Sequence, residues 1–451
     1  MGKITLKQAA LWCGGHVEEQ YENITFFGAN NDTRALEPGQ LFIALRGTRD
    51  GHDFIPAAME KGAAAVLCSR KVGDFPAIVV EDPRIALGQI AREERKRLGM
   101  KVVGVTGSVG KSTTKEMIAQ VLSGTYRVGK TPVNHNNDIG MPMAILAMEE
   151  NTEIAVLEMG MNHFREMAYL SRIALPDLAV IINIGTMHIE FLGSVEGIRQ
   201  AKMEILEGMG EDGQLILNGD DPMLRNPGMV PAQKITYFGS DSGCRFRLCQ
   251  VTQQNGLQFR VEWEGGSFPV EMDLEGAHFA ADAMAAVSVG LMLGVSPEEI
   301  RQRLSGFRNM EGRQQIFQQD GYTIIKDCYN AGPESMEAAL NVLGNRTGRR
   351  VAVLGEMLEL GRCALAEHYR VGRIAAEKAD MVIAYGHSAS RICSGCITGG
   401  MPDSNAKSFT DKEALVLYLK RTAKPGDTIL VKGSRGMHME EILDAFLKAE
   451  K

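Results

Sequence analysis

A glycine-rich turn lies between an apolar run and a helical run, and a lysine follows its second glycine. The turn reads Thr106-Gly107-Ser108-Val109-Gly110-Lys111-Ser112. Glycines let backbone N–H groups converge on phosphate oxygens, and a helix N-terminus adds partial positive charge. Lys111 would bring a full charge to the outer phosphates, and Ser112 or Thr113 would bring a hydroxyl to Mg²⁺. Val105 stands where the strict pattern of such loops has its first glycine, but the strand-to-helix context still predicts a nucleoside triphosphate site.

Polar residues follow two other apolar runs of the same region. Glu158 comes directly after Ile154–Leu157, where an ATPase holds a Mg²⁺ ligand. His188 follows Leu178–Ile184 and is either a ligand or a satisfied polar residue. Lys202 lies on the next helical stretch, where the sequence alone favours a solvated lysine. Glu158 is therefore the stronger candidate for magnesium.

Apolar runs that alternate with helices predict a parallel sheet covered on both faces. In such a sheet the polar residues that follow the strands would lie close together. Residues 100–312 show this alternation, and we expect a P-loop ATPase-like domain there. A hairpin-like insert runs from Lys234 to Asp273, and a helix follows over His278–Leu293. The predicted strands are Lys101–Thr106, Ile154–Leu157, Leu178–Ile184 and Gln214–Leu217.

The alternation restarts after residue 312, so residues 313–451 predict a second open α/β sheet, of the Rossmann-like kind. Ligands of such sheets bind beyond the carboxyl ends of the strands. Asp327 and the anion-shaped turn Lys432–Gly436 are the candidates there. The predicted strands and helices are Thr323–Lys326, Arg350–Leu354, Met381–Tyr385, Thr428–Val431, Pro333–Leu343, His368–Lys378, Lys412–Thr422 and Met437–Leu447.

Residues 1–99 have a different texture, with short strands, turns and a closing charged helix at Arg84–Leu98. The predicted strands are Leu41–Ala44, Ala64–Cys68 and Ala77–Val80. A length of 451 residues is also enough for about three domains. We therefore predict an α/β chain with a small α/β N-terminal domain, a central P-loop ATPase-like parallel-sheet domain and a Rossmann-like C-terminal domain.

Charge and composition exclude several classes of protein. The net charge of −7 is unlike the basic footprint of a nucleic-acid binder, and 44% hydrophobic residues exclude global disorder. We find no signal-peptide run and no apolar run long enough to span a bilayer, so we expect a cytoplasmic protein with no nucleic-acid or membrane partner. Only Cys393 and Cys396 are closely spaced, which favours reduced thiols over a zinc site.

Several runs of residues resemble the Mur ligase family, and they cover all three segments. Asn31–Arg34 and Gly47–His52 are similar to its UDP-sugar-binding domain, and Thr131–Gly140 to the stretch that follows its ATP loop. Gly355–Gly361 and Lys432–Arg435 are similar to the C-terminal signatures of one member. The resemblance implies ATP and Mg²⁺ as cofactors.

The resemblance also implies roles for individual residues. Lys202 matches a lysine that is carbamylated in many members, which turns a cation into an anion able to hold a second Mg²⁺. The implied metal ligands are Ser112, Glu158, His188 and Lys202, and the implied catalytic residues are Lys111, Glu158, His188, Lys202 and Asp327. The implied ATP-binding residues are Gly107, Ser108, Val109, Gly110, Lys111, Ser112, Thr113, Asn134, Arg313 and Asn330. The implied substrate-binding residues are Thr33, Arg34, Gly47, Asp50, Gly51, His52, Lys432, Ser434 and Arg435.

Two places depart from the family pattern. The family helix usually begins with a His-Asn pair and has a second Asn three residues on, whereas Phe279 follows His278 here and Asp282 takes the later position. The usual Asn-Ala-Asn-Pro run has Gly332 at its third position. Both places normally help to hold adenine and ribose, so the sequence leaves open how this chain holds the base.

The member with those C-terminal signatures joins D-alanyl-D-alanine to UDP-N-acetylmuramoyl-tripeptide through an acyl phosphate and forms ADP, in the last cytoplasmic step of peptidoglycan precursor synthesis. We expect the same reaction here, from a monomer. One alternative is a sister ligase of the Mur or folylpolyglutamate type that adds a single amino acid, although the last segment lacks the Asp-Asn-Pro-Arg run of the diaminopimelate-adding type. The other is a non-catalytic nucleotide- or UDP-sugar-binding regulator, against which the intact Lys111, Glu158 and Asp327 argue.

Overall fold

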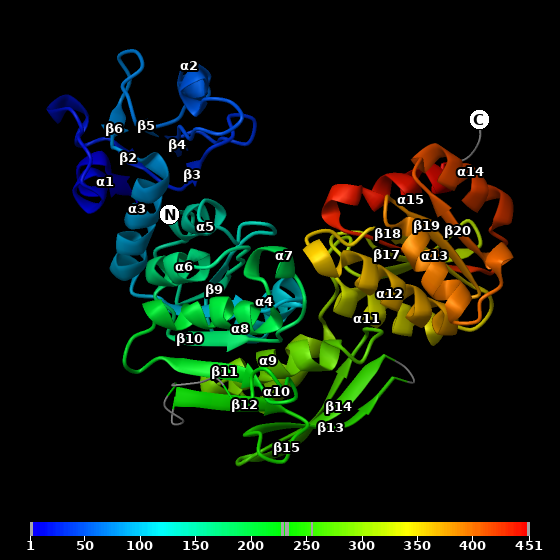
Figure 1. Ribbon diagram of the computed structural model, residues 1–451. Coiled ribbons are helices and arrows are strands. Elements are labelled where there is room, and N and C mark those ends of the chain that lie inside the picture. The colour runs from blue at the N-terminus through cyan, green and yellow to red at the C-terminus, as the bar shows by residue number, and fades with distance from the viewer. Residues whose placement is uncertain (1–2, 227–229, 231–233, 254–255, 449–451) are drawn as a thin grey trace.

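The computed structural model describes residues 3–226, 230, 234–253 and 256–448. Figure 1 shows an N-terminal body in blue, a central body in cyan to green and a C-terminal body in yellow to red (residues 3–99, 100–312 and 313–448). The N-terminal and C-terminal bodies both adjoin the central one. Each body is a sheet with helices packed on it, so the predicted α/β class is confirmed. The domain boundaries after residues 99 and 312 stay a prediction.

The N-terminal body is built on a four-stranded parallel sheet in the order β3-β4-β5-β6. The three strands expected there end within about a residue of their predicted bounds, and an antiparallel pair, β1 and β2, lies beside the sheet. The strands are β1 (Ile4–Thr5), β2 (Thr25–Phe26), β3 (Ala29–Asn30), β4 (Leu41–Ile43), β5 (Ala65–Cys68) and β6 (Ala77–Val79), and the first helices are α1 (Leu6–Cys13) and α2 (Ile55–Glu60).

Helix α3 (Pro83–Leu98) joins the N-terminal body to the central body. The carboxylate of Asp82 caps its N-terminus by accepting from the backbone N–H of Arg84 at 2.8 Å, and Gly99 ends it in the left-handed conformation. Apolar side chains of α3 belong to a core that continues from the N-terminal sheet into the central body. A Cβ on Gly88 would lie 2.4 Å from the hydroxyl of Tyr169, so glycine permits the close approach of α3 to the central helix that carries Tyr169.

The central body holds a nine-stranded sheet in the order β15-β14-β13-β12-β11-β10-β7-β9-β8. The strands from β8 to β13 are parallel, and β14 and β15 extend the sheet in antiparallel pairing. The insert predicted as hairpin-like is thus a continuation of the main sheet, and only its last three strands have hairpin pairing. The strands are β7 (Lys101–Thr106), β8 (Val128–Lys130), β9 (Ile154–Glu158), β10 (Leu178–Ile181), β11 (Gln214–Asn218), β12 (Ile235–Gly239), β13 (Phe246–Thr252), β14 (Leu257–Trp263) and β15 (Gly266–Met272).

Strand β10 is shorter than its apolar run predicts. It ends at Ile181. The residues that follow no longer pair with strand β11 and instead contact the glycine-rich turn. The backbone N–H of Ile182 donates to Thr106, and the carbonyl of Asn183 accepts from the N–H of Ser108. The apolar side chains of Ile182 and Ile184 are therefore explained by burial beside the turn and not by pairing with β11.

Helices cover both faces of the central sheet. Val102 of β7 packs with residues of α3 and α6, whereas Val103 and Val105 pack with α4 and α9, as the alternation of side chains along a strand requires. The helices of this body are α4 (Lys111–Leu122), α5 (Gly140–Leu146), α6 (Glu166–Ala174), α7 (Ile189–Leu192), α8 (Val195–Met203), α9 (Phe279–Met292) and α10 (Pro297–Ser305).

The C-terminal body is a six-stranded sheet in the order β16-β17-β21-β18-β19-β20. Only the pair β16 and β17 is antiparallel. One face is covered by α11, α12 and α13 and the other by α14 and α15. The elements are β16 (Gln315–Gln319), β17 (Tyr322–Asp327), β18 (Arg350–Gly355), β19 (Met381–Tyr385), β20 (Ala406–Phe409), β21 (Thr428–Lys432), α11 (Pro333–Gly344), α12 (Ala364–Lys378), α13 (Ala389–Thr398), α14 (Lys412–Thr422) and α15 (Met439–Leu447).

Cys393 and Cys396 lie on α13 and are buried in the C-terminal core. Burial raises the pKa of the Cys396 thiol to about 12. Within the described ranges, no helix is both long enough and apolar enough to cross a membrane.

The shared core around α3 predicts a stability effect. Ile90 is fully buried in it, whereas Ile85 on the same helix is 51% exposed. We expect Ile90→Ala to cost about 2–5 kcal/mol of unfolding free energy, because it leaves a cavity in a packed core. Ile85→Ala is the matched control and should change stability little. Urea unfolding followed by circular dichroism measures both, and equal midpoints for the two variants would contradict the shared core.

Candidate active site

A cavity of about 950 Å³ lies where the carboxyl ends of the central strands face the C-terminal body. Twelve residues with a predicted role line it, and they come from both bodies. They are Ser108, Val109, Gly110, Lys111, Ser112, Thr113, Glu158, His188, Arg313, Asp327, Asn330 and Lys432. Gly107, Asn134, Lys202, Ser434 and Arg435 are not among its lining residues. Asn134 is exposed and adopts a φ of 67°, so its role in ATP binding stays a prediction.

The glycine-rich turn connects β7 to α4, as predicted, and two of its backbone N–H groups are already in use. The Asn183 side chain accepts from the N–H groups of Ser108 and Val109 at 3.0 and 2.9 Å. No side chain caps the N-terminus of α4, so the N–H groups of the first turn of α4 are the ones offered to phosphate. The sequence did not indicate Asn183, because nothing in its spacing marks it as a partner of the turn.

Gly110 must be glycine for two reasons. Its φ is +83°, and a Cβ there would lie 2.5 Å from a carboxylate oxygen of Asp282 on α9. Lys111, the next residue, folds back so that its Nζ donates to the carbonyls of Gly107 and Ser108 at 2.9 and 3.3 Å. Burial lowers the pKa of Lys111. The turn therefore holds the amine of a partly buried lysine against its own carbonyls.

Ser112 and Glu158 meet as the sequence predicts. The Ser112 hydroxyl donates to the Glu158 carboxylate at 2.6 Å, and the Asn136 amide donates to the other carboxylate oxygen at 2.9 Å. Glu158 is buried, and Thr131 accepts from its backbone N–H at 2.9 Å. Buried Lys115 in turn donates to the carbonyl of Thr131 at 2.6 Å. Asn136, which the sequence analysis did not single out, thus orients the carboxylate.

The hydroxyl and carboxylate oxygens of Ser112 and Glu158 are the hard donors that Mg²⁺ prefers. Within the part of the chain that the structure describes, no group of three or more His, Cys, Asp or Glu residues could hold a metal by itself. This fits magnesium, which keeps several waters and binds substrate phosphates as well as one or two protein groups.

Arg313 reaches from the start of the C-terminal body to the phosphate loop. Its guanidinium donates to the Ser112 hydroxyl at 2.7 Å and lies 3.9 Å from the centre of the Tyr329 ring. The stacked ring and the hydrogen bond fix the arginine between the two bodies. Arg313 thus lies beside the phosphate loop, and its role in ATP binding stays a prediction; Tyr329 is a supporting residue that no sequence motif indicated.

His188 and Lys202 both lie near the phosphate loop, and the charge of Lys202 acts on His188. Nδ1 of His188 is 2.6 Å from a carboxylate oxygen of Glu359 in the C-terminal body, and burial lowers the pKa of His188. Lys202 is fully buried, and its Nζ donates to the carbonyl of Gly107 at 3.0 Å. Burial and the nearby charge of Lys111 lower the pKa of Lys202 far below that of an ordinary lysine. The prediction from the sequence alone that Lys202 is a solvated lysine is therefore wrong.

The predicted substrate-binding residues of the C-terminal body differ in burial. Lys432 is buried and donates to the Asp327 carboxylate at 2.7 Å and to the Asn330 carbonyl at 2.9 Å. The Ser434 hydroxyl is also buried, and it joins the loops by donating to the carbonyl of Ala331 at 3.1 Å. Arg435 is exposed and pairs with Glu440 of α15. Lys432 and Ser434 therefore brace loops, and their predicted contact with substrate stays a prediction.

The turn after β21 differs from the anion-shaped turn that its sequence suggests. A short 3-10 turn at Arg435–Met437 intervenes, and α15 begins at Met439, two residues later than predicted. His438, the residue before α15, adopts the left-handed conformation and does not cap the helix with its side chain. The turn is therefore separated from the helix N-terminus that would bind an anion.

A second cavity, of about 760 Å³, lies in the N-terminal body. Thr33, Arg34, Gly47 and Gly51 line it, together with the basic side chains of Arg46, Arg49 and Arg84. Asp50 and His52 lie behind this surface: Nδ1 of buried His52 is 2.6 Å from Asp50, and its Nε2 accepts from the N–H of Ser69 at 3.1 Å. Hydrogen bonds from His52 lower the pKa of Asp50. These two residues therefore shape the loop whose predicted role is substrate binding.

The residues that depart from the family pattern are all accommodated. Phe279 is buried and stacks on His278 with ring centres 4.1 Å apart. A Cβ at Gly332 would lie 2.3 Å from the sulfur of Met187. Asp282 accepts from the Thr114 hydroxyl at 2.9 Å, and burial raises its pKa to about 7. These contacts of Phe279 and Asp282 are with other protein side chains. How this chain holds the base of the nucleotide therefore stays open.

The fold and the site together define a nucleotide-dependent enzyme class, in which a phosphate loop at the edge of a parallel sheet faces a second α/β body. Three family profiles match the chain in sequence order: "Mur ligase family, catalytic domain" at residues 24–103, "Mur ligase middle domain" at 105–290 and "Mur ligase, glutamate ligase domain" at 312–435. The chain belongs to the Mur ligase family.

Named relatives match over the whole chain. It is 42% identical to UDP-N-acetylmuramoyl-tripeptide--D-alanyl-D-alanine ligase of Bacillus subtilis (strain 168), covering 100% of this chain and 99% of the relative. The crystal structure of MurF from Acinetobacter baumannii superposes with a TM-score of 0.92 at 31% identity, covering 100% of both chains. MurF ligase from Thermotoga maritima in complex with ADP has a TM-score of 0.82 at 31% identity and covers 93% of this chain and 97% of its own.

The raised pKa of Asp282 predicts how stability depends on pH. Its value is about 7 in the folded protein against the usual 3.8, so the folded chain keeps a proton that the unfolded chain has lost. Stability should therefore fall as pH rises from about 4 to about 7, by on the order of 4 kcal/mol at most. We expect Asp282→Asn to remove this loss.

Thermal unfolding at pH 5 and pH 8 measures the effect of Asp282→Asn. The wild-type protein should lose more of its melting temperature between the two pH values than the variant does. Asp212→Asn, at an exposed position, is the matched control and should behave like the wild type. Equal pH dependence in all three proteins would show that Asp282 titrates normally.

Proposed function

We propose that this chain is an ADP-forming, ATP-dependent ligase that joins D-alanyl-D-alanine to UDP-N-acetylmuramoyl-tripeptide in peptidoglycan precursor synthesis. The observation that carries the proposal is the match at 42% identity over the full length to a relative of that name. The site supports it, because the phosphate loop, Glu158 and Arg313 meet in one cavity between two bodies. We also propose that the reaction takes place in the cytoplasm, and that the chain acts as a monomer because one chain builds both cavities.

The chemistry begins with a carboxylate that is a poor electrophile. Transfer of the γ-phosphoryl group of ATP onto the terminal carboxylate of the tripeptide gives an acyl phosphate and ADP. The amine of D-alanyl-D-alanine then attacks the carbonyl carbon, and inorganic phosphate leaves with the C–O electron pair as the amide forms. The proton of the amine passes to a base. One ATP is therefore spent for each amide bond.

The first step joins two anions, so positive charge must offset their repulsion. Lys111 and the N-terminus of α4 supply it from the phosphate loop, and Arg313 supplies it from the C-terminal body. Mg²⁺, held by Ser112 and Glu158, would add charge at the phosphates when it is bound. Ser112 and Glu158 are buried and Lys111 and Arg313 are partly buried, and charges interact more strongly where water screens them less.

We further propose that Lys202 is carbamylated, as the family resemblance implies. Its amine is fully buried, its pKa is far below the ordinary value, and a backbone carbonyl accepts its hydrogen bond. Lowering the pKa of an amine raises its uncharged fraction at a given pH, and the uncharged form is the one that adds to carbon dioxide. The resulting carbamate would place a negative charge beside Lys111, where it would hold His188 and a second Mg²⁺ in place.

We propose that the N-terminal cavity binds the UDP portion of the substrate. Arg34, Arg46 and Arg49 line it, and guanidinium groups suit the planar, bidentate recognition of phosphate oxygens. Arg84 of α3 adds a fourth and is paired with Asp138 of the central body at 2.7 Å. This pair ties the cavity to the body that carries the phosphate loop.

A panel of acceptors tests the proposed specificity. With ATP, Mg²⁺ and UDP-N-acetylmuramoyl-tripeptide present, D-alanyl-D-alanine should release inorganic phosphate, whereas glutamate, lysine and meso-diaminopimelate should not. A coupled phosphate assay measures the release. Turnover with a single amino acid in place of the dipeptide would assign the chain to a sister ligase, and no turnover with any acceptor would favour the non-catalytic alternative.

Lys111→Ala tests the role of the phosphate loop. We expect kcat to fall by at least about 100-fold, because the transition state loses a buried positive charge. The affinity for the UDP-tripeptide, measured by calorimetry without ATP, should stay nearly unchanged because the proposed UDP site lies in another body. Lys101→Ala is the matched control at an exposed position of β7. Normal turnover by Lys111→Ala would contradict the proposed mechanism.

A further inference from the structure

We propose that Glu359 is a positioning residue for His188, supplied by the C-terminal body to the site in the central body. The proposal rests on the function proposed above, because it concerns the same site. Nδ1 of His188 lies 2.6 Å from a carboxylate oxygen of Glu359. This nitrogen is buried and, among the described residues, makes no hydrogen bond of good geometry, so the Glu359 carboxylate meets it as a close polar contact. The carboxylate that faces the imidazole therefore comes from the opposite body.

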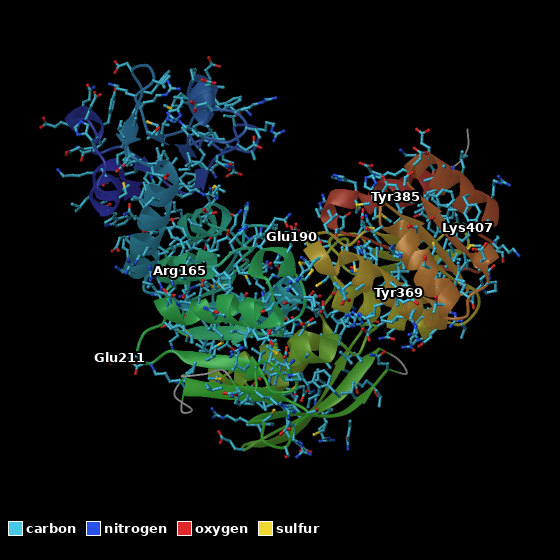
Figure 2. The ribbon with its side chains drawn as sticks, viewed as in Figure 1. Arg165, Glu190, Glu211, Tyr369, Tyr385 and Lys407 are labelled. Atoms are coloured by element: carbon cyan, nitrogen blue, oxygen red, sulfur yellow. The ribbon has the colours of Figure 1, made fainter. Side chains whose placement is uncertain are left out.

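The backbone of both partners is held in an uncommon conformation. Glu359 has a φ of 63° and His188 a φ of 67°, and residues other than glycine adopt this region at a cost that the surrounding structure must offset. Figure 2 shows Glu190, a residue of α7, where the central body faces the C-terminal body. The backbone N–H of Glu190 donates to the carbonyl of Glu359 at 3.4 Å. Main-chain and side-chain contacts therefore join the same two segments.

Two buried side chains of the C-terminal body brace the loop that carries Glu359. The Ser434 hydroxyl accepts from the N–H of Leu358 at 2.9 Å, and Nε2 of His368 accepts from the N–H of Met357 at 3.0 Å. Both side chains are buried. The two residues before Glu359 are thus fixed from two directions, so the direction of the Glu359 side chain is set by the fold of its own body.

A carboxylate at Nδ1 determines which form of the imidazole is present. It keeps the proton on Nδ1, fixes the ring, and leaves Nε2 as the nitrogen with a free lone pair. His188 lines the cavity together with Lys111. The oriented form of His188 therefore exists only while the C-terminal body is docked, which makes docking a condition for a complete phosphate site.

Three variants test this inference through kcat and KM. Glu359→Ala should lower kcat by about 10- to 100-fold, the usual effect of losing such a partner, with little change in KM for ATP. Glu359→Gln should recover most of kcat, because its amide oxygen still accepts from Nδ1–H. Glu190→Ala is the matched control: it lies at the same junction, its side chain is exposed, and its backbone N–H is retained.

A second readout does not depend on turnover. Long-range ¹H–¹⁵N spectra of protein labelled with ¹⁵N-histidine report the ring tautomer, and His188→Asn assigns the signal. Wild type and Glu359→Gln should show His188 with the proton on Nδ1, and Glu359→Ala should show a loss of that preference. If Glu359→Ala does not fold, Glu359→Ser replaces it in both measurements.

The outcomes separate this inference from the proposed function. An unchanged tautomer and an unchanged kcat in Glu359→Ala would overturn the positioning role, as would an equal loss of kcat in Glu359→Ala and Glu359→Gln with no change of tautomer. Failure of the wild-type protein to use D-alanyl-D-alanine would overturn the proposed function and leave the tautomer result to decide the role of Glu359.

Discussion

Phosphoryl transfer between two anions requires positive charge and the exclusion of water at one place. In this protein that place lies between the central sheet and the C-terminal sheet, so the site depends on how the edges of these two sheets face each other. The contacts across that junction include three polar pairs. Arg313 donates to Ser112, Thr186 donates to Glu334 at 2.9 Å, and Glu359 meets His188. Each contact links a residue of the C-terminal body to a residue that follows a central strand. The site is therefore a property of the docked arrangement and not of either body alone.

Buried lysines hold the loops that form the site. Lys115, Lys202 and Lys432 are each almost fully buried, and burying an ammonium group costs free energy unless it is paired and hydrogen-bonded. Each reaches a backbone carbonyl, at Thr131, Gly107 and Asn330 respectively. Lys432 also has the Asp327 carboxylate, whereas Lys202 has the carbonyl and the repulsion of Lys111. That difference is the physical reason for expecting Lys202 to carry a modification that removes its charge.

The two outer bodies are attached to the central body in different ways. The N-terminal sheet and α3 share one apolar core with the central body, whereas the C-terminal body has cores of its own. Ile189 of α7 packs against both the central core and a C-terminal core. The N-terminal cavity is therefore held firmly relative to the phosphate loop. Polar contacts hold the C-terminal body, and they cost less to break than a packed core, so it is the body expected to open for substrates.

The local features of this protein could be predicted from its amino-acid sequence. Apolar runs located most of the strands, because strands buried on both faces must be continuously apolar, and the phosphate loop could be read because its chemistry is contiguous. Tertiary structure alone decided the rest. Asn183 supports the turn, Lys202 is buried under it, and Glu359 faces His188, yet each pair is far apart in the chain and no spacing links its members. Short-range patterns report how a segment folds, whereas the partner of a side chain depends on which sheet edges meet, and that is settled only when whole bodies pack together.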